Sequence, residues 1–181
     1  MTKRITPGQE DFYTAATECL ENAAESVRKA VKTNLDDYRF VDLGLPSGTL
    51  WATANVVDHD NRPAYLSWDD AMEMFPHNVP SWELFQELKE QCEWKWVTAS
   101  KTPGTKHPGY KVTGPNGASI FLPAAGFRRG SRVGSVGTGG NYWSSSVINK
   151  VDAYGVGFFG GHLYPRNDHY RHSEFSVRLS R

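Results

Sequence analysis

The sequence has 181 residues, of which 39% are hydrophobic, 13% aromatic and 22% charged, a composition typical of one globular domain with or without an appendage. Basic and acidic residues number 20 each, and the resulting zero net charge argues against a nucleic-acid-binding protein. No apolar run approaches the ~20 residues that span a bilayer, so no membrane insertion is expected. The two cysteines, Cys19 and Cys92, exclude a disulfide scaffold and a four-cysteine zinc site, and we expect both to be reduced and half-buried.

Residues 1–37 are predicted to form an N-terminal appendage, a helix followed by a linker. Apolar residues recur at steps of three and four and predict one amphipathic helix over residues 8–35. This helix either packs on its own domain or joins copies into a homo-oligomer. The N-terminus is polar and lacks the apolar stretch that a signal peptide contains. We therefore expect a virion-associated or cytoplasmic protein, or a cell-surface protein whose leader has been trimmed.

Residues 38–181 are predicted to form the domain proper. Serine caps precede two short helices, one beginning after Ser67 and the other after Ser81. The sequence Gly114-Pro115-Asn116-Gly117 between two alternating runs predicts a hairpin. Alternating apolar residues predict strands at 38–44, 49–56, 93–98, 110–113, 118–122 and 175–179. Strands, then two helices, then more strands indicate an α+β fold.

The last third of the chain differs from the rest in charge and in glycine content. Residues 1–123 carry 12 basic and 17 acidic residues, whereas residues 124–181 carry 8 basic and 3 acidic residues. The second part also holds 10 of the 17 glycines. This glycine density predicts a helix-poor region of long loops.

No motif for a cofactor or for a common catalytic centre is present. Phosphate-binding loops, dinucleotide fingerprints and zinc-protease or hydrolase motifs are all missing from the sequence, so no cofactor is expected. His162, His169 and His172 lie near Asp168 and Glu174 in the sequence, but their spacing matches no zinc pattern. We expect solvated histidines and no metal site.

The segment from Val151 to Ser173 lacks five residue types completely. Its 23 residues contain no Lys, Gln, Glu, Met or Trp, although the whole chain has 31 residues of these types. None of the five can be reached from an AAC or AAT codon by changes at its adenines alone. The segment is instead rich in Tyr, Phe, His, Asn, Asp, Arg and Gly. This mixture is typical of binding surfaces, in which aromatic rings supply contact area and small polar groups supply adaptable hydrogen bonds.

Several stretches of the chain resemble one family. They are residues 40–52, 114–126 and 140–146, closed by Phe175-Ser176-Val177-Arg178. Together they resemble the major paralogous domain of Fibrobacter succinogenes, which is abundant in gut Bacteroidetes, over about residues 38–181. The resemblance implies a C-type lectin-like fold of the formylglycine-generating-enzyme branch. Some members of the family are variable proteins of diversity-generating retroelements, which rewrite adenine positions near the end of a target gene.

The resemblance also implies which residues are scaffold and which are diversified within the hypervariable region, about residues 128–173. The expected scaffold positions are Ala153, Val156, Phe158, Pro165, Arg171 and Phe175. The expected variable, ligand-binding positions are Arg129, Arg132, Tyr154, Gly155, Gly157, Phe159, Gly160, Gly161, His162, Tyr164, Arg166, Asn167, Asp168, His169, Tyr170 and His172.

The leading hypothesis is a non-enzymatic protein that binds a protein or a surface glycan through this diversified surface. The sequence lacks the triplets of calcium-dependent sugar-binding lectins and the late cysteine pair of formylglycine-generating enzymes. Two alternatives stay open. One is an enzyme related to that group, or a hydrolase using His162, His169 or His172. The other is a structural subunit of a virion or pilus.

Overall fold

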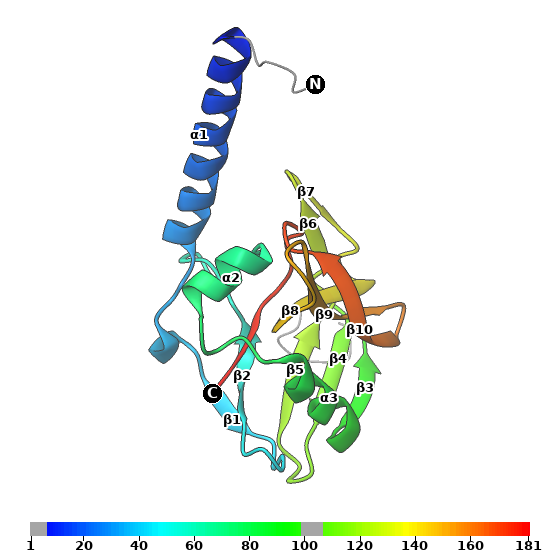
Figure 1. Cartoon of the computed structure of the whole chain (residues 1–181). Helices are drawn as coiled ribbons and strands as arrows, with labels where there is room; N and C mark the ends of the chain where they lie inside the picture. Colours follow the sequence, from blue (N-terminus) through cyan, green and yellow to red (C-terminus); the bar gives the residue numbers. More distant parts are fainter. Residues whose placement is uncertain (1–6, 99–106) are drawn as a thin grey trace.

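The computed structural model of the chain describes residues 7–98 and 107–181, except the side chains at 7–13, at 165–168 and at four further positions of the first helix. That helix, α1 (Pro7–Ala30), stands away from a mixed domain (Figure 1). In the domain, two short helices, α2 (Trp68–Met74) and α3 (Trp82–Gln91), lie beside small antiparallel sheets. The predicted α+β class is confirmed.

The end of α1 was predicted incorrectly. The chain leaves the helix before Val31, five residues earlier than expected, because Val31 is buried in the core at 4% exposure and its backbone bridges Asp58. The Lys32 N–H then donates to the Val57 carbonyl at 3.0 Å. Within the expected linker lies a short 3-10 helix, η1 (Leu35–Asp37), capped by Asn34. Tertiary pairing of the backbone therefore ends the helical pattern.

Both short helices of the domain begin where the sequence predicted. The Ser67 hydroxyl accepts a hydrogen bond from the Asp70 N–H, and the Ser81 hydroxyl accepts one from the Leu84 N–H. Each cap satisfies a backbone donor that the first turn leaves without a helical partner. In α3, Phe85 is buried on the face that packs into the domain.

Strands from both ends of the chain form the first sheet, whose order is β1-β2-β11. Its members are β1 (Phe40–Asp42), β2 (Leu50–Asn55) and β11 (Arg178–Ser180). The predicted final strand, 175–179, is wrong at its start. Phe175 pairs instead with Leu66, and the Ser176 N–H donates to the Asn141 carbonyl at 3.1 Å. These residues cross between sheets before the chain joins β2.

The second sheet contains the predicted hairpin and has the order β3-β4-β5. Its members are β3 (Glu93–Val97), β4 (Gly109–Thr113) and β5 (Ser119–Pro123). Gly117 has a φ of +84°, which glycine adopts without strain, and the Gly114 N–H closes the hairpin by donating to the Ala118 carbonyl at 2.9 Å. The Asn-Gly signal therefore located this turn correctly.

The last third of the domain is a sheet, and the expected long loops are wrong. A hairpin of β6 (Phe127–Arg129) and β7 (Arg132–Gly134) precedes three long strands in the order β10-β9-β8. These strands are β8 (Gly139–Val147), β9 (Asp152–Phe159) and β10 (His162–Tyr170). Glycines here permit close packing as well as turns: a Cβ added at Gly140 would lie 2.6 Å from the Phe158 ring.

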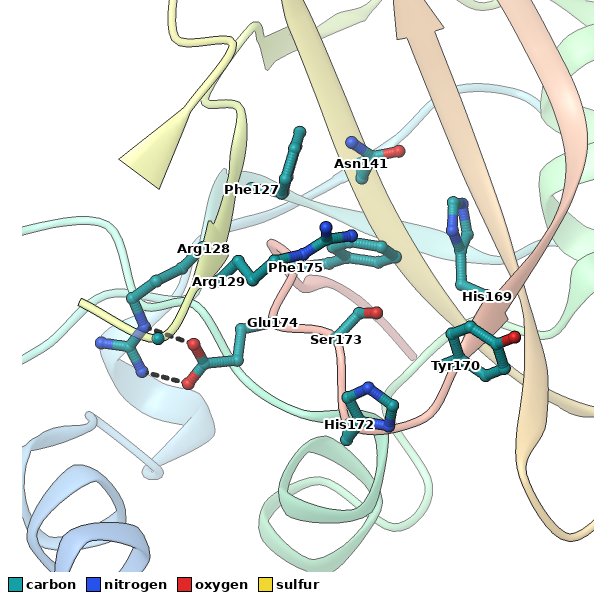
Figure 2. Close-up of a pocket in the computed structure, with 11 residues that line it drawn as sticks. Phe127, Arg128, Arg129, Asn141, His169, Tyr170, His172, Ser173, Glu174 and Phe175 are labelled. Carbon is teal, nitrogen blue, oxygen red and sulfur yellow. Dashed lines mark hydrogen bonds and ion pairs between the residues drawn. The ribbon is translucent and has the colours of Figure 1, made fainter. Parts of the chain in front are cut away.

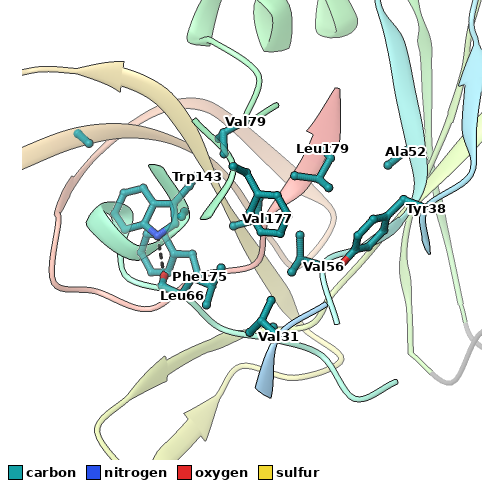
Figure 3. Packing of buried hydrophobic residues seen from close by; sticks show 14 residues of the cluster. Val31, Tyr38, Ala52, Val56, Leu66, Val79, Trp143, Phe175, Val177 and Leu179 are labelled. Carbon is teal, nitrogen blue, oxygen red and sulfur yellow. Dashed lines mark hydrogen bonds between the residues drawn. The ribbon is translucent and has the colours of Figure 1, made fainter. Parts of the chain in front are cut away.

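The buried residues form two clusters, and strands β2, β8 and β9 each contribute side chains to both. In the first cluster, the Trp143 ring lies 4.4 Å from the Phe175 ring, and its indole N–H donates to the Leu66 carbonyl at 2.9 Å (Figure 3). In the second cluster, Phe158 packs edge-on against Tyr110 at 5.3 Å. Because aromatic side chains bury large areas, these contacts account for much of the domain's apolar core.

A buried arginine joins the three main sheets. Arg178 of β11 is fully buried, and its guanidinium donates to the Ala52 carbonyl of β2 at 2.7 Å and to the Phe121 carbonyl of β5 at 2.6 Å. It also donates twice to the Asn55 side-chain oxygen, at 3.0 and 2.5 Å. The Asn55 amide in turn donates to the Tyr142 hydroxyl of β8 at 3.2 Å. Burial lowers the pKa of Arg178 to about 10.

Tyr142 completes this network. Its hydroxyl donates to the Pro123 carbonyl of β5 at 2.8 Å, and burial raises its pKa to about 12. A phenolate could not donate this bond, so the neutral phenol is the form that the fold requires. The polar cluster thus fixes the position of β8 relative to β2, β5 and β11.

Replacing Arg178 with methionine should destabilise the domain strongly. The R178M variant leaves the Asn55 oxygen and two carbonyls buried without their donor, and each such loss costs about 1–3 kcal/mol. We expect the free energy of unfolding, measured by urea denaturation, to fall by about 3 kcal/mol or more. The matched control is R132M, because Arg132 is exposed on β7. An R178M variant as stable as R132M would contradict the structural role of Arg178.

Candidate functional site

One face of the β10-β9-β8 sheet packs into the domain, and the other is open in part, because Phe159 is exposed there whereas Gly155 and Gly157 are buried. Side chains alternate along β9, so Val156 and Phe158 are buried in the second core cluster. Gly157 and Phe159 border a hollow on the opposite side. We call this open side, with the β6–β7 hairpin and the turn after β10 that border it, the concave face.

The larger hollow of the concave face has a volume of about 630 Å³. It lies between the β6 strand, the open side of the sheet and the turn that follows β10 (Figure 2). Its lining residues are Phe127, Arg128, Arg129, Gly130, Asn141, His169, Tyr170, His172, Ser173, Glu174 and Phe175. Rings, hydroxyls, an amide and guanidinium groups therefore surround a space large enough for several ligand side chains or a small sugar.

A second hollow of about 380 Å³ adjoins the first. The two share Phe127 and Asn141, so they form one continuous surface. The residues that line the second hollow are Phe127, Ser135, Gly139, Asn141, Gly157, Phe158, Phe159 and Tyr164. Few of these side chains can ionise, and the second hollow is the more apolar part of the concave face.

Large aromatic side chains are exposed on this face. Phe159 is 56% exposed, Tyr164 48% and Tyr170 62%. The rings of Tyr170 and His172 stack at 5.4 Å with 10° between their planes, which creates a flat platform at the edge of the larger hollow. Exposed aromatic groups gathered around a hollow are typical of a surface that a partner covers.

His169 joins this platform to the core. Its ring packs edge-on against Phe175 at 4.6 Å and against Trp143 at 6.1 Å. The imidazole is half-buried, and its backbone pairs with Ala153 of β9. His169 therefore holds β10 in place as well as lining the hollow.

The border of the larger hollow on the hairpin side is fixed by an ion pair. Arg128 donates to the two carboxylate oxygens of Glu174 at 2.8 and 2.5 Å, in a bidentate arrangement (Figure 2). The Arg128 N–H also donates to the Glu174 carbonyl at 2.9 Å, and its guanidinium donates to the Tyr65 carbonyl at 3.2 Å. The carboxylate of Glu174 raises the pKa of Arg128. Together these bonds attach the β6–β7 hairpin to the turn after β10.

The predicted variable residues divide into those on the concave face and those elsewhere. Seven of them line the two hollows, namely Arg129, Gly157, Phe159, Tyr164, His169, Tyr170 and His172. Arg132, Gly160, Gly161 and His162 lie outside the lining, on β7 and at the β9–β10 turn. The side chains of Arg166, Asn167 and Asp168 fall outside the described part, although the backbone register pairs Asp168 with Tyr154.

Two further predicted variable residues, Tyr154 and Gly155, do not line the hollows. Tyr154 lies on the packed side of β9, with its ring 6.3 Å from that of Trp82 on α3. Gly155 is buried, and a Cβ added there would lie 3.0 Å from the Tyr142 carbonyl oxygen. Neither residue adds to the lining of the concave face in the part of the chain that the structure describes.

The expected scaffold positions are buried or half-buried wherever their side chains are described. Ala153, Val156, Phe158 and Phe175 are buried. Arg171 is half-buried, with its guanidinium 4.2 Å above the Trp68 ring and paired with Asp69. The side chain of the remaining position, Pro165, lies outside the described residues.

Several lining residues were not predicted from the sequence. They are Phe127, Arg128, Gly130, Ser135, Gly139, Asn141, Ser173 and Glu174, with the scaffold residues Phe158 and Phe175 also at the surface of a hollow. Asn141 lies within a stretch that carried the family resemblance, and this could have identified it. The pairing of Arg128 with Glu174 joins residues 46 positions apart, and no local pattern indicates it.

The chemistry of the described side chains offers no assembled metal centre. Across residues 7–98 and 107–181, no group of three His, Cys, Asp or Glu side chains is arranged to hold a metal ion. Both cysteines are free. Cys92 is half-buried, and burial raises its pKa to about 11, whereas Cys19 is exposed, contrary to the expectation that it would be half-buried.

Comparisons with known proteins add no assignment. The chain matches no protein-family model, no curated protein and no solved structure. Among the helices that the structure describes, none has the length and apolar character needed to cross a membrane. The function of the chain must therefore be inferred from the concave face itself.

Substituting Glu174 with glutamine should loosen the β6–β7 hairpin. The neutral amide retains the size of the carboxylate but loses the charge-assisted pair with Arg128, a change that costs about 1 kcal/mol for a half-buried pair. We expect faster amide hydrogen exchange at Arg128 and Val133, which pair across the hairpin. The control is E93Q, because Glu93 is exposed on β3. Unchanged exchange in E174Q would show that the ion pair does not hold this border.

Proposed function

We propose that this chain is a non-enzymatic ligand-binding protein. A C-type lectin-like scaffold would hold the concave face as a retroelement-diversified surface that recognises a protein or a surface glycan. The observation that carries the proposal is the arrangement of the predicted variable residues. Seven of them line two adjoining hollows, whereas the scaffold positions described between them are buried or packed against the core.

The alternation of β9 and β10 supports this proposal. On β9, Phe158 is buried and the next residue, Phe159, is exposed. On β10, the exposed Tyr164 pairs with Gly157, which borders the same hollow. The exposed side chains of these strands, such as Phe159 and Tyr164, can change without altering the buried ones. This is the physical requirement for a surface that is to be diversified repeatedly.

The side chains of the larger hollow favour binding over hydrolysis. A histidine that acts as a general base in a hydrolase is commonly oriented by a carboxylate. Among the described residues that line this hollow, the carboxylate is that of Glu174, which Arg128 already holds in a bidentate pair. His169 packs edge-on against Phe175 and Trp143, and His172 is stacked on Tyr170. These contacts suit a recognition surface.

The exposed helix supports a multivalent arrangement of the same protein. Every described side chain of α1 from Thr14 to Ala30 is exposed, except for the half-buried Ala16. We infer that α1 joins copies of the chain into a homo-oligomer. Several identical concave faces on one particle would then bind a surface with greater avidity than a single face.

Randomising the concave face should preserve the fold and create new binding specificities. The library would be displayed on yeast with the full chain, and it would vary the exposed positions Arg129, Phe159, Tyr164, Tyr170 and His172. The control library would vary the buried positions Trp143, Ala153, Val156, Phe158 and Phe175. Surface substitutions usually change stability by about 0.5 kcal/mol or less, whereas losses in the core reach about 2–5 kcal/mol.

The readouts are surface expression and binding to immobilised serum albumin, a probe protein. We expect most members of the exposed library to express as well as the parent, and selection to yield albumin binders. The buried library should express poorly. Equal loss of expression in both libraries, or failure of the exposed library to yield any binder, would contradict the proposal.

A further inference from the structure

Two adjacent arginines of β6 have different surroundings. Arg128 is occupied by the bidentate pair with Glu174, and its side chain is 27% exposed. Arg129 is exposed and lines the larger hollow. Figure 2 shows its side chain running inward from β6, away from Glu174 and toward the middle of the lining residues. One arginine therefore fixes the hairpin, and the other presents its guanidinium to whatever enters the hollow.

The charge of this hollow is unbalanced in the part of the chain that the structure describes. Its lining carries two guanidinium groups and one carboxylate, that of Glu174, so one positive charge lacks a counterpart in the lining. The other polar groups at the surface include the Asn141 amide and the Ser173 and Tyr170 hydroxyls, each of which can donate a hydrogen bond. A monovalent anion fits one uncompensated cation and a set of neutral donors.

We propose that Arg129 binds the carboxylate of an acidic side chain, aspartate or glutamate, on a protein partner. The planar guanidinium can hold a carboxylate through two parallel hydrogen bonds, and the partial enclosure of the hollow strengthens such a pair relative to open water. This inference rests on the proposed binding function and names the chemistry that the concave face selects.

The adjoining hollow favours a protein as the source of the carboxylate. Phe159 and Tyr164 border this hollow, and both are about half exposed. With the stacked Tyr170 and His172 on the other side of Arg129, the concave face has a cation between two aromatic areas. Aromatic anchors beside a charged group are typical of protein–protein contacts, in which an acidic residue is flanked by apolar side chains.

Selection from a random peptide library tests this inference and does not require the natural partner to be identified. A phage-displayed library of random peptides would be selected on the full chain and on two single-charge variants, R129Q and a control. The control is R39Q: Arg39 is exposed before β1 and lines neither hollow, so R39Q makes the same change of charge outside the site. A fourth selection uses Y170A, which removes an exposed ring of the platform.

We expect the parent and R39Q to enrich peptides containing Asp or Glu beside aromatic or aliphatic residues, at least threefold over the unselected library. R129Q should lose the acidic enrichment, and individual acidic peptides should bind it at least tenfold more weakly, the factor that corresponds to about 1.4 kcal/mol. Retention of acidic enrichment by R129Q would overturn the inference. So would its loss in R39Q.

Two outcomes separate this inference from the proposed function. Peptides that depend on Tyr170 but show no preference for acidic residues would overturn the role of Arg129 while leaving the concave face as a binding surface. Peptides unaffected by Y170A would count against the concave face itself.

A parallel panel of neutral and uronic-acid oligosaccharides tests the class of partner. Binding of uronic-acid sugars without enrichment of any peptide would overturn the assignment to a protein.

Discussion

The guanidinium of Arg178 lies where three sheets meet, and the acceptors that surround it are neutral oxygens of β2 and β5. Burying a charge in this way is costly unless its hydrogen bonds are made, so the network acts as a strict geometric condition on the fold. Through Asn55 the same network reaches the Tyr142 hydroxyl on β8. The sheet that carries the concave face is therefore positioned by a polar cluster as well as by apolar packing. This allows a stable position for β8 even though β8 and β9 each contain two glycines.

The concave face depends on that fixed position. Trp143, next to Tyr142 on β8, packs on Phe175, and His169 of β10 packs on both rings. Arg128 and Glu174 then attach the β6–β7 hairpin to the turn after β10. The borders of the larger hollow are thus connected to the core through Trp143, Phe175 and the Arg128–Glu174 pair, which lie outside the expected variable positions, and through His169, which is one of them. The exposed residues between these supports can vary in size and polarity with little effect on the interior.

Local signals in the sequence predicted the parts of the fold that local physics controls. The caps at Ser67 and Ser81 and the hairpin turn at Gly117 lie where they were expected, because each depends on a few adjacent residues. The end of α1 and the strands of the last third were predicted wrongly. Val31 leaves the helix to pair with a distant segment, and glycines that suggested loops instead permit close packing between strands. Seven lining residues of the concave face were among the variable positions that the family resemblance implied, whereas its borders arise from pairs such as Arg128 and Glu174 that only the folded chain brings together.

The most direct test of the account is to sequence the DNA around the gene. A diversified concave face predicts a nearby repeat, almost identical to the segment encoding about residues 128–173 and differing from it at adenines, beside a reverse transcriptase gene. The differences should fall in codons for exposed residues such as Phe159, Tyr164 and Tyr170, and should spare those for Val156 and Phe158. Absence of the repeat and the reverse transcriptase would contradict the account. So would substitutions concentrated in the codons of the buried positions.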